Sequence, residues 1–390
     1  MPVPFPADRS APARPRPTRS FGILSTFPPT ACGIATFSAA LAAGLTAGGD
    51  SVDVVRVGPG PVGLEDAVVR GFLPATGAPD DALEVLDQTD VAIIQHEFGI
   101  YPGDDGAGLL PVMAGLNVPS VVVAHTVPER PSAGQRRVLT AVCEAATAVV
   151  VMTAHGRVGL IERFGIDPDK VHAIAHGAAT PAAGGTPRRL HERPRVLTWG
   201  LLGPGKGIEW AIEAFAELAD MRPRPQYVVA GATHPKVKEL DGEQYRNMLV
   251  KRAWAAGVAP HVHFDDAYRD LPALTELIVS ADLVVLPYDS EDQVTSGVLV
   301  DAVAAGRPVV STAFPHAVEL LASGAGIVVP QRDPKALAAA IREVLADRSL
   351  REEMASEARR LAPALSWAAV ASDYADLADA LLAGRSTAVR

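Results

Sequence analysis

The sequence predicts an α/β protein made of two doubly wound, Rossmann-like domains facing a central cleft, and three observations support this. A chain of 390 residues is too long for one ordinary hydrophobic core. Short apolar runs alternate with segments of helical periodicity in two successive series. Between the series lies a stretch of proline, glycine and alanine that is typical of a linker.

Changes in composition set the expected boundaries. Residues 1–20 are rich in proline and arginine, and we expect a flexible tail because they cannot bury enough apolar surface to offset their ordering entropy. The first domain is expected over 21–180, the linker over 181–194 and the second domain over 195–364. A final helix is expected over 365–384.

Both series contain apolar runs of the kind found in strands that are buried on both faces of a parallel sheet. In the first series a strand and a loop precede a helix expected over 34–46. Strands of the first series are expected at 21–26, 51–57, 91–94, 120–124 and 148–152. Those of the second series are expected at 195–200, 226–231, 261–264, 283–286 and 309–311.

Composition narrows the class of protein. The formal charge of −10 argues against nucleic-acid binding, which needs a basic surface. Two cysteines cannot build a disulfide framework or a thiolate metal cage. No apolar run reaches the roughly 18 residues of a transmembrane helix. Residues 1–20 lack the apolar core of a signal peptide, so we expect a cytoplasmic protein without a membrane span.

The segment 290–311 carries the strongest functional signal. It follows an apolar strand, runs through small polar residues and opens a helix that stops at Gly306 before the next strand. A helix N-terminus beyond a parallel strand favours anions, and Gly297 lets a phosphate approach the backbone closely. The residues predicted to bind phosphorylated substrate here are Thr295, Ser296, Gly297 and Val298.

Three further loops follow strand ends, where ligands of α/β sheets bind. Gly33 stands just ahead of an apolar helix and permits a close approach of ligand. His96 and Glu97 follow one strand, and His125 follows the next. We interpret all four as substrate-binding or catalytic residues, against the alternative that they are structural turn residues.

The glycine-rich loop 200–207 also joins a strand to a helix and carries Lys206. It nearly matches the phosphate loop of nucleoside triphosphatases, but Gly207 stands where that motif needs serine or threonine for magnesium. Asp167 and Asp169 form an Asp-x-Asp pair, which we interpret as turn residues. His261 and His263 share a strand face without a third ligand nearby. We expect no metal site.

Two motifs together resemble the retaining glycosyltransferases of family four, which have the GT-B fold. That family usually carries two glutamates separated by seven residues; here Gln293 and Asp301 have this spacing, followed by the exit Gly-Arg-Pro-Val-Val at 306–310. The family also has Gly-Arg-Leu-x-x-x-Lys-Gly at the glycine-rich loop, where Lys206 matches the lysine and Leu201 replaces the arginine. The resemblance covers nearly everything after the tail, and it is nearest to the mannosyltransferase-like branch.

The resemblance implies roles for the domains and residues. The first domain would bind the acceptor and the second the donor, with the final helix returning to the first domain. Lys206 would contact the donor diphosphate, His125 and Gln293 the donor sugar, and Asp301 the nucleotide ribose. His96 and Glu97 would line the acceptor side. The implied substrates are a nucleoside-diphosphate hexose of mannose or glucose type and a hydroxyl acceptor, with no cofactor and no metal.

Two alternatives stay open from the residues alone. A GT-B epimerase or phosphorylase would share the fold but would need acidic groups in the cleft or a lysine-bound cofactor. A non-catalytic sugar-nucleotide-binding subunit is compatible with the departures at Leu201, Gln293 and Asp301. Release of free nucleoside diphosphate separates an enzyme from a binder.

Overall fold

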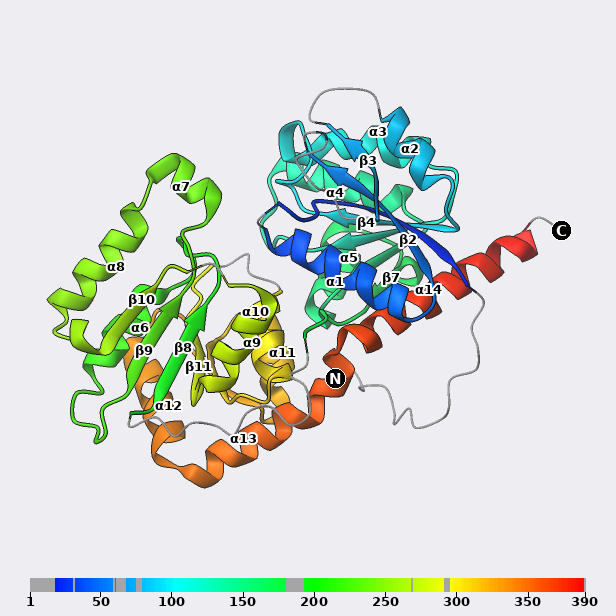
Figure 1. Ribbon diagram of the computed structural model, residues 1–390. Coiled ribbons are helices and arrows are strands. Elements are labelled where there is room, and N and C mark those ends of the chain that lie inside the picture. Colours follow the sequence, from blue (N-terminus) through cyan, green and yellow to red (C-terminus); the bar gives the residue numbers. More distant parts are fainter. Residues whose placement is uncertain are drawn as a thin grey trace. The chain divides into compact units, whose positions relative to one another are not determined.

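A computed structural model shows two compact units (Figure 1). The structure describes residues 18–30, 32–58, 60, 68–74, 79–179, 193–267, 269–290 and 295–388, with side chains up to 384. The first unit holds the described residues up to Gly177 together with those from Trp367 onward. The second unit runs from Ala178 to Ser366. The predicted fold class, two Rossmann-like doubly wound domains, is confirmed.

The first unit is built on a parallel sheet of seven strands in the order β3-β2-β1-β4-β5-β6-β7. The strand order reverses between β1 and β4, which is where α/β sheets bind ligands at their carboxyl edge. The strands are β1 (Ser20–Ser25), β2 (Ser51–Val57), β3 (Val69–Leu73), β4 (Val91–His96), β5 (Ser120–Ala124), β6 (Ala148–Val151) and β7 (Val171–Ala173).

Helices cover both faces of this sheet. On one face α1 (Gly33–Ala47) lies beside α14 (Trp367–Ala388) (Figure 1). Phe37, Leu41 and Tyr374 of these helices are buried there among strand residues. The other face is covered by α2 (Asp80–Leu86), α3 (Leu110–Gly115), α4 (Ala133–Ala145) and α5 (Ala154–Phe164). The last helix of the chain therefore belongs to the core of the first unit.

The second unit has a parallel sheet of six strands in the order β10-β9-β8-β11-β12-β13. Its strands are β8 (Arg195–Trp199), β9 (Gln226–Ala230), β10 (Val262–Asp265), β11 (Leu283–Leu286), β12 (Val309–Thr312) and β13 (Gly326–Val329). One core contains residues of α6 (Ile208–Ala216), α8 (Gln244–Ala255) and α12 (Pro334–Ala346). The remaining helices are α7 (Pro235–Asp241), α9 (Leu271–Ser280), α10 (Gly297–Ala304), α11 (Pro315–Leu320) and α13 (Arg348–Leu361).

One expectation was wrong at the end of the predicted tail. Ser20 opens β1, and Arg19 is only 4% exposed. The Arg19 guanidinium contacts the Asp50 carboxylate at 3.0 Å and that of Asp379, on α14, at 2.8 Å. A buried carboxylate needs a paired charge, which explains why an arginine is retained inside this unit. Residues 1–17 of the predicted tail and residues 181–192 of the predicted linker lie outside the described residues.

Candidate functional site

In the first unit the predicted polar residues gather at the carboxyl edge of two neighbouring strands. His96 is the last residue of β4, and His125 follows the end of β5. The backbone N–H of His125 donates to the carbonyl of His96 at 3.1 Å, because β4 and β5 pair in parallel up to His96 and Ala124. Thr126 donates a hydrogen bond from its hydroxyl to the Glu97 carboxylate. The structure therefore brings His96, Glu97 and His125 together, as the strand-end positions predicted.

The two histidines have different surroundings. His96 is fully buried, neither ring nitrogen has a hydrogen-bond partner in the described structure, and burial lowers its pKa to about 4. His125 is half-buried, and its Nε2 lies 2.6 Å from Oε1 of Gln95. Burial, with smaller effects of His176 and His96, lowers the pKa of His125 to about 3. Both imidazoles are therefore neutral near pH 7, and His125 donates from Nε2 to Gln95.

Gln95 is a residue that sequence reasoning missed. The strand expected over 91–94 ended before it, whereas β4 runs to His96 and Gln95 is fully buried in it. Its Oε1 lies 2.6 Å from Nε2 of His125 and so orients that ring. The ring of Phe37 packs edge-on against His125, with centroids 5.0 Å apart, and against His176 at 5.1 Å. Trp367 of α14 packs edge-on against Phe37 at 5.0 Å. The imidazole of His125 is therefore in contact both with Gln95 and with an aromatic cluster that contains Phe37.

Gly33 opens α1 just beyond β1. A Cβ built on Gly33 would meet nothing within 4 Å, so the space beside this backbone is open. Cys32 is the N-cap of the helix, and its Sγ accepts a hydrogen bond from the backbone N–H of Ala35 at 3.3 Å. The role predicted for Gly33, the close approach of a ligand, stays a prediction that this open space would allow.

In the second unit the glycine-rich loop runs from β8 to α6 and is held against the end of β11. Gly205 and Gly207 have φ of +88° and +61°, which favours glycine. A Cβ on Gly207 would lie 1.8 Å from the carbonyl oxygen of Pro287, so no side chain fits there. The backbone N–H of Asp289 donates to the carbonyl of Gly205 at 3.1 Å. Lys206 is thus presented from a tightly constrained turn.

The predicted phosphate-binding helix α10 begins beside this loop. Ser296 is its N-cap and accepts a hydrogen bond from the backbone N–H of Leu299 at 3.2 Å. A Cβ on Gly200, the first residue of the glycine-rich loop, would lie 3.5 Å from Cγ2 of Val298. Gly297 is the first helical residue, and Thr295 is half-buried ahead of the cap. Gln293 lies outside the described residues.

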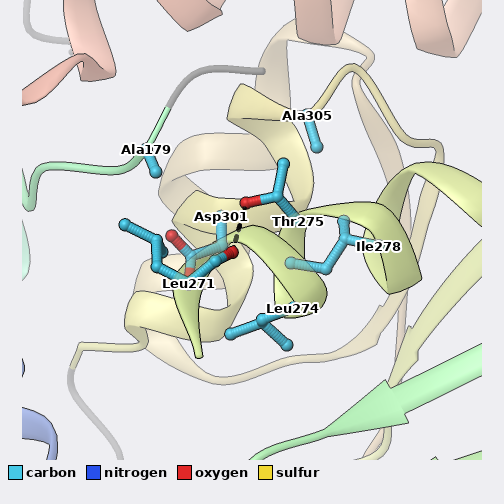
Figure 2. A pocket seen from close by; sticks show the side chains of 7 residues that line it. All are labelled: Ala179, Leu271, Leu274, Thr275, Ile278, Asp301 and Ala305. Carbon is cyan, nitrogen blue, oxygen red and sulfur yellow. Dashed lines mark hydrogen bonds between the residues drawn. The ribbon is translucent and has the colours of Figure 1, made fainter. Parts of the chain in front are cut away.

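Asp301 lies one turn further along α10 and faces a small pocket between α9 and α10 (Figure 2). Thr275 in this pocket donates its hydroxyl hydrogen bond to the backbone carbonyl of Leu271 at 2.8 Å. Burial among mostly apolar groups raises the pKa of Asp301 to about 7. The pocket is lined by Ala179, Leu271, Leu274, Thr275, Ile278, Asp301 and Ala305.

Asp167, one of the residues set aside as metal ligands, takes part in a local turn. Oδ1 of Asp167 accepts a hydrogen bond from the backbone N–H of Asp169 at 3.0 Å, within a short 3₁₀ turn. In the described part of the chain no group of three or more histidine, cysteine, aspartate or glutamate side chains is placed to hold a metal ion. The helices that the structure describes are each too short or too polar to span a bilayer.

Two Rossmann-like units, one of which combines a glycine-rich loop carrying a lysine with a capped helix N-terminus, define an α/β protein of the GT-B type. Family models match nearly the whole described chain: "Glycosyltransferase Family 4" over residues 31–182 and "Glycosyl transferases group 1" over 187–361. The chain belongs to the GT-B-fold glycosyltransferases of family four. The resemblance inferred from the motifs is confirmed at the level of this family.

Sequence relatives agree with this assignment. The D-inositol 3-phosphate glycosyltransferase of Jonesia denitrificans is 30% identical over 254 residues, which are 60% of this chain and 56% of that protein. The alpha-D-kanosaminyltransferase of Streptomyces kanamyceticus is 30% identical over 241 residues, 58% of each chain. The chain therefore spans little more than half the length of these curated relatives.

Solved structures show the same fold. Sucrose-phosphate synthase from Thermosynechococcus elongatus has a TM-score of 0.73 and 20% identity, covering 94% of this chain and all of that one. HepE of Anabaena in complex with UDP has a TM-score of 0.70 and 15% identity, covering 93% and 100%. At these low identities the similarity shows a shared fold and nothing about substrates.

Proposed function

We propose that this protein transfers a hexose from a nucleoside-diphosphate sugar to a hydroxyl acceptor, with retention of the anomeric configuration. The observation that carries the proposal is that the glycine-rich loop carrying Lys206 packs beside the first turn of α10, since a Cβ on Gly200 would lie 3.5 Å from Cγ2 of Val298. An ammonium and a helix N-terminus are two independent sources of positive potential, and in this proposal both act on one ligand. A diphosphate is the ligand whose charge and size such a place fits best.

These groups would act on the leaving group. When the bond between the anomeric carbon and the phosphate oxygen breaks, negative charge grows on the nucleoside diphosphate. Lys206 and the backbone around Gly297 would stabilise that charge in a preorganised arrangement. The acceptor oxygen forms its bond to the anomeric carbon on the same face, and its proton passes to the departing phosphate. No protein nucleophile takes part in this scheme.

Asp301 would bind the nucleotide ribose in this proposal. The pocket between α9 and α10 is lined by Asp301 and by apolar residues that include Leu271, which is 55% exposed (Figure 2). A ribose diol can donate hydrogen bonds to a carboxylate, and a base can cover exposed apolar surface. Gln293 is proposed to contact the hydroxyls of the sugar.

In the first unit His96 and Glu97 are proposed acceptor-side residues, and His125 a contact of the donor sugar. Gln95 accepts from Nε2 of His125, so Nδ1 is the unprotonated nitrogen of this neutral ring. His125 can therefore act as a hydrogen-bond acceptor from a hydroxyl group through Nδ1. A neutral acceptor suits a sugar or cyclitol hydroxyl better than it suits a phosphate.

The donor hexose is proposed to be of mannose or glucose type. Relatives named D-inositol 3-phosphate glycosyltransferase suggest a phosphorylated cyclitol as the first acceptor to test, and the HepE complexes with UDP and UDP-glucose suggest uridine donors. Neither a cofactor nor a metal is part of the proposed reaction. Activity is therefore expected to survive EDTA, and loss of activity that manganese or magnesium restores would contradict this part.

One experiment tests the proposal in two stages. Thermal unfolding is measured with UDP, GDP and ADP and with their glucose and mannose conjugates, since a ligand that binds the folded state raises Tm by mass action. The stabilising donor is then incubated with inositol 3-phosphate and with simple sugars, and free nucleoside diphosphate is quantified. Stabilisation with acceptor-dependent release supports a transferase. Stabilisation without any release would instead make the protein a sugar-nucleotide-binding subunit.

A further inference from the structure

The side chain of Lys206 lies over an aromatic ring that no motif predicts. Its Nζ is 4.3 Å from the centroid of the Tyr288 ring, within the range of a cation–π contact. Tyr288 follows β11 and is only 1% exposed, so its ring is held firmly in the protein. Lys206 itself is half-buried. The contact therefore joins a charged side chain on a loop to a rigid surface beneath it.

Both the ring and the backbone of Tyr288 have partners in the second unit. It stacks on Phe314, with ring centroids 5.2 Å apart and an interplanar angle of 28°. The backbone carbonyl of Tyr288 accepts a hydrogen bond from the hydroxyl of Thr312 at 2.5 Å. The Tyr288 hydroxyl is buried and has no hydrogen-bond partner in the described structure. The ring, and not the hydroxyl, is therefore the part of Tyr288 that the structure uses.

The loop that carries Lys206 is fastened to the same segment. Gly207 packs against the carbonyl of Pro287, and Gly205 lies against Ser290, where a Cβ would come within 3.2 Å of the serine Cβ. The indole N–H of Trp210 donates to the Asp289 carboxylate at 3.0 Å. The backbone of the loop, the Lys206 side chain and the first turn of α6 therefore all contact one segment, residues 287–290 after β11.

We propose that Tyr288 is a positioning residue for Lys206: its ring face holds the ammonium where it meets the donor diphosphate. This inference rests on the proposed function of Lys206. A lysine has a flexible stem of four carbons, and ordering it on binding costs free energy. A ring that already orders the lysine removes part of that cost, which is preorganisation. This matters more here because Leu201 provides no second cation in the loop.

Three substitutions separate the ring's role from its packing. Tyr288→Phe keeps the ring and loses only the unpartnered hydroxyl. Tyr288→Leu removes the ring and keeps an apolar side chain. Phe314→Leu is the matched control, because it disrupts the same stacked pair without removing the ring beneath Lys206. We expect Tyr288→Leu to weaken nucleoside-diphosphate binding about three- to thirtyfold, and Tyr288→Phe and Phe314→Leu to change it less than twofold.

A readout without nucleotide keeps the inference testable on its own. In protein with ¹³C-labelled lysine, the Hε resonances of Lys206, assigned by their loss in Lys206→Met, are expected to be shifted upfield by the ring. The shift is expected to persist in Tyr288→Phe and to vanish in Tyr288→Leu. A Tyr288→Leu protein that is folded and keeps the shift would overturn the proposal.

Binding in the double variant decides whether Tyr288 acts through the lysine. On a Lys206→Met background Tyr288→Leu is expected to have no further effect on affinity; an undiminished effect would mean that Tyr288 acts by packing alone, and would overturn the inference. If Lys206→Met itself bound nucleoside diphosphate like the parent, the proposed function of the lysine would fail. If Lys206→Met weakened binding but Tyr288→Leu did not, only the inference about Tyr288 would fail.

Discussion

Nδ1 of His316 accepts a hydrogen bond from the backbone N–H of Ser296 at 3.1 Å. Ser296 is the N-cap of α10, and His316 stands near the start of α11, only 5% exposed. An imidazole nitrogen that accepts a hydrogen bond carries no proton, so His316 is neutral in this arrangement. One buried side chain from α11 thereby orients the residue that opens the proposed phosphate-binding helix.

His316→Ala is expected to loosen this helix terminus. The substitution leaves the buried N–H of Ser296 without its partner, which costs about 1–3 kcal/mol and lowers Tm by a few degrees. We expect nucleoside-diphosphate affinity to fall about three- to tenfold, measured by titration calorimetry. Val318→Ala is the control, since Val318 is on the same helix and 52% exposed. Unchanged affinity in His316→Ala would limit His316 to a role in stability.

Lys206→Ala is expected to lower turnover by about two to three orders of magnitude, as for the loss of one preorganised stabiliser of developing charge. Tm is expected to change little, because a half-buried loop lysine contributes mainly its contact with Tyr288. Lys251→Ala, which removes an exposed lysine of α8, is the matched control. Equal turnover in the Lys206→Ala protein and the parent would show that the diphosphate is bound elsewhere.

The sequence predicted the central strands well because they are buried on both faces and consist of continuous apolar residues. Three of the four edge strands, β3, β7 and β13, escaped prediction; each is short and partly exposed, as the half-buried Gly326 and Ile327 of β13 show. The fourth, β10, was expected over 261–264 although it is also short and partly exposed. The rule that ligands bind beyond strand ends located His96, His125 and Lys206 correctly on their sheet edges.

The residues that support the site could not be found in this way. Each of these residues contacts a partner that is distant in the sequence: Gln95 contacts His125, Tyr288 contacts Lys206 and His316 contacts Ser296. The periodicity of a single helix or strand cannot predict such contacts. Their burial makes them resemble core residues. A polar side chain inside a buried strand is a sign of such a role, and Gln95 within β4 is an example.

Arg19 shows that composition alone can misplace a boundary between tail and domain. It also yields a prediction about stability. A run of arginine and proline, residues 14–17, comes shortly before it, yet Arg19 contacts Asp50 and Asp379 from a buried position. Arg19→Ala leaves the carboxylate of Asp50 buried without its partner, and we expect a loss of about 3–5 kcal/mol in the free energy of unfolding of the first unit. Urea unfolding followed by circular dichroism measures this loss.

The control is an exposed ion pair in the same unit. Arg70 contacts Asp53 at 3.1 Å, with the two side chains 61% and 39% exposed. Arg70→Ala is expected to cost no more than about 1 kcal/mol, because water screens such a pair. Equal costs for Arg19→Ala and Arg70→Ala would contradict the account of Arg19 as a buried link between the first strand and the last helix.

The raised pKa of Asp301 is expected to show in how the stability of the protein depends on pH. Burial raises its pKa from 3.8 to about 7, so folding favours the protonated carboxyl group. The stability that this group contributes is complete below about pH 4 and is lost as the pH rises through about 7. The side chain of the Asp301→Asn variant has nearly the same shape as aspartate but does not titrate. We therefore expect the variant and the parent to unfold alike near pH 4, and the variant to be more stable at pH 8 by roughly 1–3 kcal/mol.

Nucleotide binding is expected to depend on pH in the opposite sense, because it favours the ionised carboxylate of Asp301. A ribose hydroxyl that donates to the ionised Asp301 carboxylate lowers its pKa, so affinity for nucleoside diphosphate rises with pH between about 6 and 8 in the parent. The amide that replaces the carboxylate in the Asp301→Asn variant cannot ionise, and the affinity of this variant is expected to vary less over the same range. Unfolding curves and titrations of both proteins at matched ionic strength measure the two effects. If the difference in stability between variant and parent were constant from pH 4 to pH 8, Asp301 would not titrate in the pocket, and its proposed contact with ribose would lose this support.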